Sequence, residues 1–524
     1  MDKSFDSSRN IKRGVILSYL SMGLSIVISI LYTPFVIRRL GEQQYGIYQV
    51  GAAVIGYLSI LNFGLGSTIV RYAAKYRTEK KEREASSLYG LFITIFSVLA
   101  VIVIISGFVI TCFKESIFKV STGATGYRQL GIIIMLMSLN LAISFPASVY
   151  SSIITTYERF TFLKSVTILT SILTPAVVIP VLLLGYKAVG LTVAVQAIHI
   201  LASFSYVAYV HFKLKVKISF DLSVLGKDVL KSIFGFTLFI FIGVLIDQLY
   251  WSTDKIILGV VIDEVAVGVY AVGAQIHSYY QQFSGSISEV LFPRITKMVT
   301  LDASKKDLTE LFIKVGRMQN YILSAILIGF FVLGKEFISF WAGRGYEDAY
   351  IIALLVLTPA TVPLIQSTGF LIIKAMNKHR FRAIVYLIIA VLNALTSIPA
   401  AMALGGIGCA ICTCVCAVIG HGIIMNWYYY KKIGLDIPLF WRKNVPILLV
   451  TAVIGALFFA VNVIIGPGSF IMLCVKIAVF AAVVFVAQYL VNMNEFEKGL
   501  IKRVFYKVIG AKPERKDKNV TIQK

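Results

Sequence analysis

Residues 14–37 read GVILSYLSMGLSIVISILYTPFVI and contain no charged side chain. The hydrocarbon core of a bilayer is about 30 Å thick, and a helix needs about 20 apolar residues to cross it. The run is too long for the apolar region of a signal peptide, and it ends in Ile37-Arg38-Arg39 without a small-residue cleavage site. We therefore expect a retained first membrane-spanning helix.

Similar apolar runs recur along the whole chain of 524 residues. Hydrophobic residues make up 58% of it and charged residues 15%, against about 45–50% and about 25% in soluble domains. The pattern predicts an all-α integral membrane protein with about fourteen transmembrane helices and no soluble catalytic domain. The predicted spans are 14–37, 45–70 (interrupted by Asn62-Phe63-Gly64), 88–112, 129–151, 165–184, 189–210, 232–258, 266–291 (rich in Gln and Tyr), 313–334, 348–373, 383–403, 406–428, 446–465 and 468–491.

The net charge of +24 follows the predicted topology. Most Lys and Arg residues fall in alternate loops, and loops enriched in these residues face the cytoplasm. Both termini are therefore predicted to be cytoplasmic, and a nucleic-acid partner is not indicated. The basic segments are the N-terminus, 71–87, 157–164, 211–231, 293–317, 374–382, 431–443 and the C-terminal tail.

Two segments of the chain resemble each other at an offset of about 220 residues. Residues 40–52 read LGEQQYGIYQVGA, and residues 258–274 read LGVVIDEVAVGVYAVGA. Arg159-Phe160 and Arg380-Phe381 form a second matching pair, each preceding a predicted span that contains proline and is followed by glycines. The two matches indicate an internal duplication.

The duplication predicts a domain organisation. An offset of six helices gives both copies the same orientation, so an axis along the membrane normal would relate them around a central cavity. We expect an N-terminal lobe at 1–225 (spans 1–6) and a C-terminal lobe at 226–432 (spans 7–12). Residues 433–524 are predicted to add two spans and a basic cytoplasmic tail.

Several short motifs resemble the polysaccharide transporter, or oligosaccharide flippase, family of the multidrug/oligosaccharidyl-lipid/polysaccharide exporter superfamily. They lie in both halves of the chain, so the resemblance covers essentially its whole length. Besides the repeated segments above, they are residues 10–14 (NIKRG), 62–71 (NFGLGSTIVR), 254–259 (DKIILG) and 293–294 (PR).

The resemblance implies a function. Such a protein moves undecaprenyl-pyrophosphate-linked oligosaccharide repeat units across the bacterial cytoplasmic membrane by alternating access, for surface polysaccharide biosynthesis. The implied partners are lipid-linked oligosaccharide and membrane lipids, with polysaccharide assembly machinery as a further candidate. No cofactor is expected, and H⁺ or Na⁺ is the candidate coupling ion, on the evidence of the acidic residues described below. It leaves open which glycan is carried.

Asp247, Asp254 and Lys255 are ionisable residues within the seventh predicted span, where a charge costs about 2.5–3.5 kcal/mol on insertion scales. Asp247 and Asp254 share a helix face, whereas the adjacent Asp254 and Lys255 cannot face each other, so each needs a partner elsewhere. We predict that Asp247 or Asp254 exchanges the coupling ion and that Lys255 contributes to substrate binding. The alternative is that Asp254 and Lys255 lie near the outer end of the span and are merely hydrated or paired.

Four arginines are candidate ligands for the pyrophosphate, because the planar guanidinium group matches phosphate oxygens. Arg71 and Arg294 lie at the cytoplasmic ends of the second and eighth predicted spans, in matching places of the repeat. Arg38 and Arg39 lie on the predicted outer side. Ordinary anchoring at the membrane surface is the alternative for all four.

The eighth predicted span is unusually polar. Gln275, Tyr279 and Gln282 offer the amide, hydroxyl and aromatic groups that a sugar-binding cavity requires, and we predict that they contact the glycan. Hydrogen bonding between helices is the alternative. Cys409, Cys412 and Cys416 share a helix face within an apolar run, which favours small packing residues over a metal site.

Other functions remain as alternatives. A peptidoglycan-precursor flippase would share the lobes and a cationic cavity. A cation-coupled multidrug exporter of the same superfamily would have an acidic, mainly apolar pocket instead. A membrane enzyme such as a glycan polymerase is disfavoured, because no nucleophile constellation, metal-ligand cluster or phosphate-binding glycine loop is recognisable in the sequence.

Overall fold

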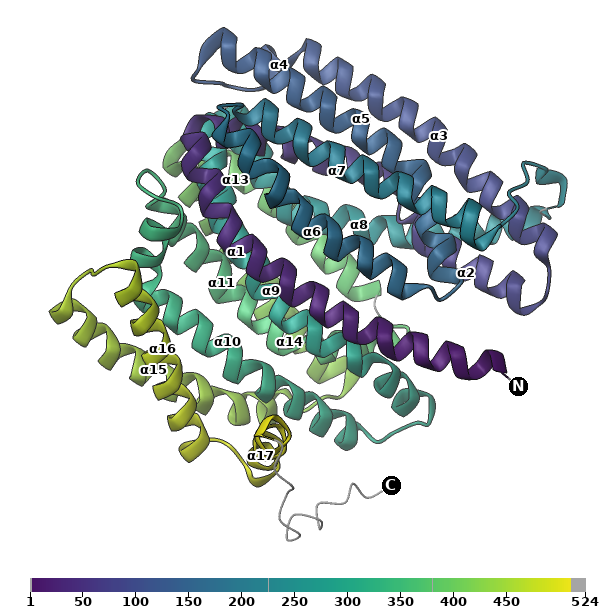
Figure 1. Cartoon of the computed structure of the whole chain (residues 1–524). Coiled ribbons are helices and arrows are strands. Elements are labelled where there is room, and N and C mark those ends of the chain that lie inside the picture. Colours follow the sequence, from purple (N-terminus) through teal and green to yellow (C-terminus); the bar gives the residue numbers. More distant parts are fainter. Residues whose placement is uncertain (1, 225, 379, 510–524) are drawn as a thin grey trace. The chain divides into compact units, whose positions relative to one another are not determined.

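The computed structural model describes residues 2–224, 226–378 and 380–509. Within these ranges, every regular element is a helix (Figure 1). The elements are α1 (Asp2–Leu58), η1 (Ser59–Asn62), α2 (Leu65–Thr78), α3 (Glu82–Cys112), α4 (Lys114–Ile117), α5 (Gly123–Thr156), α6 (Phe160–Leu183), α7 (Ala188–Ala208), η2 (Tyr209–Leu214), η3 (Leu222–Val224), α8 (Lys227–Val261), α9 (Glu264–Thr300), α10 (Lys305–Trp341), α11 (Asp348–Ile365), α12 (Ser367–Ala375), α13 (Arg380–Ala417), η4 (Val418–Ile424), α14 (Met425–Tyr428), η5 (Tyr429–Ile433), α15 (Ile437–Ile465), α16 (Phe470–Val491) and α17 (Glu495–Ile509).

The described residues include 11 helical segments that are long and apolar enough to cross a membrane. Two of them, Leu20–Thr78 and Arg380–Ile433, have 59 and 54 residues and far exceed the length of one crossing. The polar α9 is not among the 11. The multispan, all-helical class predicted from sequence is confirmed, whereas the count of fourteen stays a prediction.

Contacts divide the chain into two compact units. Unit 1 comprises Met1–Gln282, Ile338–Ala360 and Met376–Met425, and unit 2 comprises Phe283–Phe337, Thr361–Ala375 and Asn426–Lys524. These units group the chain by contact, and the two repeated lobes at 1–225 and 226–432 stay a prediction.

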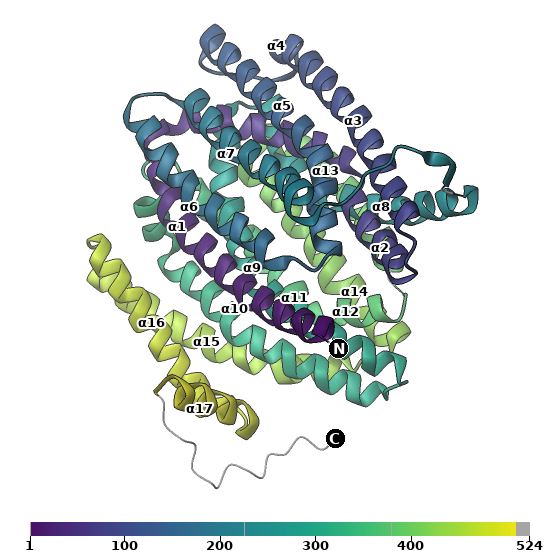
Figure 2. The same ribbon diagram turned by 45° about the vertical axis from the view of Figure 1, so that its right-hand side comes forward.

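In unit 1, long helices pack side by side. Helix α5 lies against both α3 and α7, α6 packs on α1, and α8 packs on α13 (Figures 1 and 2). A cluster of buried apolar residues, including Phe92, Phe96 and Phe145, joins α3 to α5. The predicted break at Asn62-Phe63-Gly64 is confirmed: Phe63 and Gly64 have φ of 51° and 65° and separate η1 from α2.

The repeated segments show a common backbone feature. Helix α6 begins directly after Arg159, and α13 begins at Arg380. Gly185 follows α6 with φ of 86°, and Gly405 bends α13 with φ of 60°. Both values lie in the left-handed region that favours glycine. The two matched segments thus carry a glycine-dependent turn at corresponding positions.

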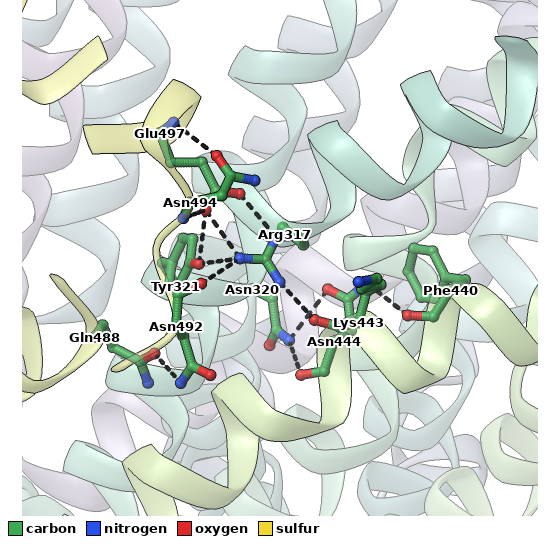
Figure 3. Close-up of polar contacts among 10 residues, drawn as sticks. All are labelled: Arg317, Asn320, Tyr321, Phe440, Lys443, Asn444, Gln488, Asn492, Asn494 and Glu497. Carbon is green, nitrogen blue, oxygen red and sulfur yellow. Dashed lines mark hydrogen bonds and ion pairs between the residues drawn. The ribbon is translucent and has the colours of Figure 1, made fainter. Parts of the chain in front are cut away.

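In unit 2, α15 and α16 are fastened to α10 by buried polar contacts. Lys476 of α16 forms an ion pair with Glu336 of α10, with N and O 3.1 Å apart. Near the other end of α10, Arg317 pairs with Glu497 of α17 at 2.8 Å and donates to the carbonyl oxygens of Lys443 and Asn492 (Figure 3).

Glu497 is buried within this cluster, with 5% of its surface exposed. Burial by itself would raise the pKa of its carboxyl group, but hydrogen bonds from Arg317, the Asn494 backbone and Tyr321 outweigh burial and lower the pKa below its ordinary value. The carboxylate therefore stays charged and holds α17 against α10.

Candidate functional site

Asp254 of α8 is the centre of a buried polar network in unit 1. Its side chain is 2% exposed. The Tyr270 hydroxyl of α9 donates to Oδ2 at 2.5 Å, and the Thr413 hydroxyl of α13 donates to the same oxygen at 2.8 Å. The other oxygen, Oδ1, is buried and has no hydrogen-bond partner among the described residues.

Two further polar residues of α13 complete the network. Asn393 donates to the Thr413 hydroxyl at 3.1 Å, and Ser397 lies one turn after Asn393 with its hydroxyl 3.5 Å from the Asn393 amide oxygen. Both side chains are fully buried. Three helices, α8, α9 and α13, thus surround the carboxylate with oxygen atoms.

This arrangement is suited to holding a small hard cation. A buried carboxylate oxygen without a partner is costly, and either a proton or a bound cation would offset that cost. Carboxylate, hydroxyl and amide oxygens are the ligands that hard cations prefer. In the described part of the chain, no group of three or more His, Cys, Asp or Glu side chains is placed to hold a metal ion.

Lys255, which follows Asp254 in the sequence, does not form an ion pair with it. Lys255 is half-buried on α8 and forms no ion pair with any described residue. The prediction that Asp254 finds its partners on other helices is confirmed by Tyr270 and Thr413. The side chain of Asp247, predicted as an alternative ion-coupling group, lies outside the described residues.

The polar residues of α9 have different surroundings. Tyr279 is buried and shares a hydrogen bond of 2.7 Å with the Ser29 hydroxyl of α1. Its ring lies edge-on to Trp341, whose indole donates to the Ile30 carbonyl oxygen at 2.9 Å. Gln275 is half-buried, and Gln282 donates to the Ser278 carbonyl oxygen of its own helix. For Tyr279 the observed contact is interhelical, and glycan binding by all three residues stays a prediction.

The predicted arginines are exposed. Arg38 and Arg39 line a cavity of about 530 Å³ together with Pro34 and Phe35, and Arg38 donates to the Phe340 carbonyl oxygen.

Arg71 lies over the Phe236 ring, 4.2 Å from its centroid, and belongs to unit 1. Arg294 belongs to unit 2 and is exposed on α9. Their action as a pair on a pyrophosphate stays a prediction.

The turn between α8 and α9 contacts elements of the first half of the chain. Glu264 is fully buried, and its carboxylate accepts hydrogen bonds from the Ser121 backbone N–H and hydroxyl, both at 2.7 Å. Lys119 donates from its backbone to Gly259 at 2.9 Å and from its ammonium group to Val261 at 2.7 Å. These contacts tie the loop before α5 to the turn.

Beside this turn, the corresponding glycines of the repeat touch. A Cβ on Gly268 would lie 3.3 Å from the Gly46 Cα atom, and a Cβ on Gly46 would lie 2.0 Å from the Glu264 carbonyl oxygen. The absence of side chains at both positions therefore lets α1 and α9 approach at this point.

Sequence reasoning missed most of the Asp254 network. The sequence gives no prediction for Thr413, Asn393 or Ser397, and it marks Tyr270 only as part of the repeated segment and of the family motif. The available signal was the spacing of Asn393 and Ser397, one turn apart within an apolar run. Cys409, predicted as a packing residue, is fully buried beside them, with its thiol 3.8 Å from the Ser397 carbonyl oxygen.

Comparisons with known proteins bear on the fold and, separately, on the family. A protein named "Putative O-antigen transporter" from Shigella flexneri is 24% identical over 369 residues, which cover 67% of this chain and 82% of that protein. The lipid II flippase MurJ in an inward closed conformation has a similar fold, with a TM-score of 0.70, 14% identity, and coverage of 95% of this chain and 99% of MurJ.

A multidrug resistance MATE family transporter of the MOP superfamily, in an inward-facing conformation, has a TM-score of 0.63 and 14% identity, covering 80% of this chain and 96% of the transporter. At these identities the structural likeness concerns the fold. The model of one family matches residues 11–299, more than half of the chain, and the chain therefore belongs to the family described as polysaccharide biosynthesis protein.

Proposed function

We propose that this protein is a flippase, and not an enzyme, that moves undecaprenyl-pyrophosphate-linked oligosaccharide repeat units across the bacterial cytoplasmic membrane for surface polysaccharide biosynthesis. The family match over residues 11–299 carries the proposal. The named O-antigen transporter among the relatives and the many membrane-spanning helices support it. Both termini face the cytoplasm in this proposal, as the distribution of Lys and Arg predicts.

Transport proceeds by alternating access and is coupled to H⁺ or Na⁺ at Asp254. The single unpartnered, buried carboxylate oxygen of Asp254 supports this role. Asp254 belongs to α8, and its hydrogen-bond partners Tyr270 and Thr413 belong to α9 and α13. Uptake or release of a cation at Asp254 therefore changes the attraction between these three helices. Asp247 is retained as a second candidate acid.

The glycan and its pyrophosphate interact with different groups. Arg71, Arg294, Arg38, Arg39 and Lys255 attract the pyrophosphate, whereas Gln275, Tyr279 and Gln282 contact sugars. To admit substrate from one side and release it on the other, contacts such as Ser121–Glu264 and Gly46–Gly268 must break during the cycle.

The experiment is a chromosomal deletion in the native host, complemented by a plasmid copy. The undecaprenyl-linked fraction is extracted and identified by mass spectrometry, and surface glycan is quantified. We expect oligosaccharide repeat units to accumulate on the inner leaflet while surface glycan falls, and complementation to reverse both changes.

The same experiment separates the alternatives. Accumulation of a peptidoglycan precursor would identify a peptidoglycan-precursor flippase. Normal lipid-linked pools together with increased drug sensitivity would indicate a multidrug exporter. Unchanged glycan export in a strain without a second family member would overturn the proposal.

A further inference from the structure

A cavity of about 450 Å³ lies among α3, α4 and α5, where α3 ends and α5 begins. Figure 1 shows the short α4 at this end of the two long helices. Lys114 and Arg128 are its two basic residues and Glu115 its one acidic residue. The remaining wall is mostly apolar and includes Ile132, Met135 and Leu136.

Lys114, one of the residues that line the cavity, is partly buried and hydrogen-bonded. Its side chain is only 19% exposed, and the ammonium group donates to the Thr111 carbonyl oxygen at 3.1 Å. Glu115 is 3.9 Å away and largely exposed, so this ion pair is weak. A side chain at Gly131 would crowd the lysine, because a Cβ there would lie 3.3 Å from the Lys114 Cδ atom.

The cavity has hydrogen-bonding capacity that the described residues leave unused. The Thr111 hydroxyl is buried and has no hydrogen-bond partner among them. Arg128 is exposed, with no hydrogen bond or ion pair to any described group. On α5, Arg128 lies three and four residues before Gly131 and Ile132, so all three share one helix face.

The apolar wall continues onto a surface that is exposed and hydrophobic. Phe108 and Phe113 of the α3–α4 region and Ile132 and Leu139 of α5 are all exposed. Helices α3 and α5 are both long and apolar enough to cross a membrane, so this surface faces lipid chains, and the ends of the two helices lie at headgroup depth.

We propose that this cavity binds the phosphate of an anionic membrane phospholipid, with Lys114 and Arg128 contacting phosphate oxygens. The lipid chains would lie along Ile132 and the neighbouring exposed apolar residues. Two basic groups against one carboxylate give a positive excess, and the apolar wall favours a lipid over free phosphate. The proposal requires that the chain spans a membrane but does not depend on the transported substrate.

The test uses the purified full-length protein in mild detergent. Binding of phosphatidylglycerol is measured by native mass spectrometry and by the rise in thermal unfolding temperature, with phosphatidylcholine and inorganic phosphate as parallel probes. For the double variant Lys114→Gln/Arg128→Gln we expect about thirtyfold weaker binding of phosphatidylglycerol, since each of the two basic groups near an anionic surface contributes about 1 kcal/mol.

The matched control is Lys187→Gln/Arg344→Gln, which removes two exposed basic groups from other loops. It should bind phosphatidylglycerol as the wild type does. If the double variant fails to fold, the exposed Arg128→Gln alone should still weaken binding severalfold. Unchanged affinity in the Lys114/Arg128 variants, an equal response to phosphatidylcholine, or an equal response to inorganic phosphate would each overturn the proposal.

Discussion

One oxygen of the Asp254 carboxylate accepts hydrogen bonds from two hydroxyl groups, while the other has no hydrogen-bond partner among the described residues. An asparagine has the same shape and can still accept from Tyr270 and Thr413. It can neither bind a proton nor carry the charge that attracts a cation. Replacing the Asp254 carboxylate by the asparagine amide therefore isolates the effect of the charge and of proton binding.

We expect Asp254→Asn to lower surface glycan in the complemented deletion strain by at least about tenfold, as loss of an essential ion site would. Stabilisation of the purified protein by Na⁺ or by lower pH should disappear in the same variant. Asp348→Asn, which alters an exposed acid at the start of α11, is the control and should behave as the wild type. Full glycan export by Asp254→Asn would contradict ion coupling at this residue.

Glu497 makes stability depend on pH. Its pKa in the folded protein lies below the ordinary value, so its contribution to the free energy of unfolding is complete above about pH 5 and is lost as the pH falls through the lowered pKa. Glu497→Gln should lower the unfolding free energy by about 2 kcal/mol at pH 7.

Thermal unfolding of the wild type and of Glu497→Gln between pH 7 and pH 3 checks this expectation. The difference in melting temperature should narrow on acidification. Glu495→Gln, which removes a highly exposed carboxylate from the same helix, should show little difference at any pH. A difference in melting temperature between the wild type and Glu497→Gln that stays constant down to pH 3 would refute the lowered pKa of Glu497.

At the scale of elements, close helix contacts depend on particular glycines. A Cβ on Gly46 would collide with the Glu264 backbone, and one on Gly268 would only crowd the Gly46 Cα atom. A Cβ on Gly243 of α8 would meet no described atom within 4 Å.

We therefore predict an order of effects for three alanine substitutions. Gly46→Ala should lower the melting temperature most, by several degrees, because backbone atoms must move apart. Gly268→Ala should have a smaller effect. Gly243→Ala should be neutral or stabilising, since alanine favours a helix by about 0.5–1 kcal/mol over glycine. Thermal unfolding of the three purified variants measures the order, and a Gly46→Ala protein as stable as Gly243→Ala would be inconsistent with the contact.

Local patterns predicted the elements well, and the site only in part. The helical class followed from apolar runs, and the break at Phe63-Gly64 followed from its residues. The partners of Asp254 could not be predicted. Thr413 is 159 positions away, and threonine is so common at contacts between membrane helices that its presence does not mark a site. The ion pair of Arg317 with Glu497 joins residues 180 positions apart, and neither residue has a sequence pattern that points to the other.

At the scale of the whole molecule, topology is the main prediction. If both termini are cytoplasmic, the loop at 79–81 faces the cytoplasm and the loop at 185–188 faces outward. In a cysteine-free background, Lys187→Cys should react with a membrane-impermeant thiol reagent in intact cells. Lys81→Cys should react only after the cells are permeabilised, and the reverse pattern would invert the proposed orientation.

The contact between Gly46 and Gly268 has a consequence for the ancestry of the chain. If the duplication predicted from the sequence took place, the two touching positions correspond to one residue that faced its own copy in a homodimer of half-length chains. In such an ancestor, a single mutation would have added bulk to both sides of the contact at once. On this prediction, fusion of the two copies would release the two positions from each other, and the unequal clearances at Gly46 and Gly268 agree with such a release.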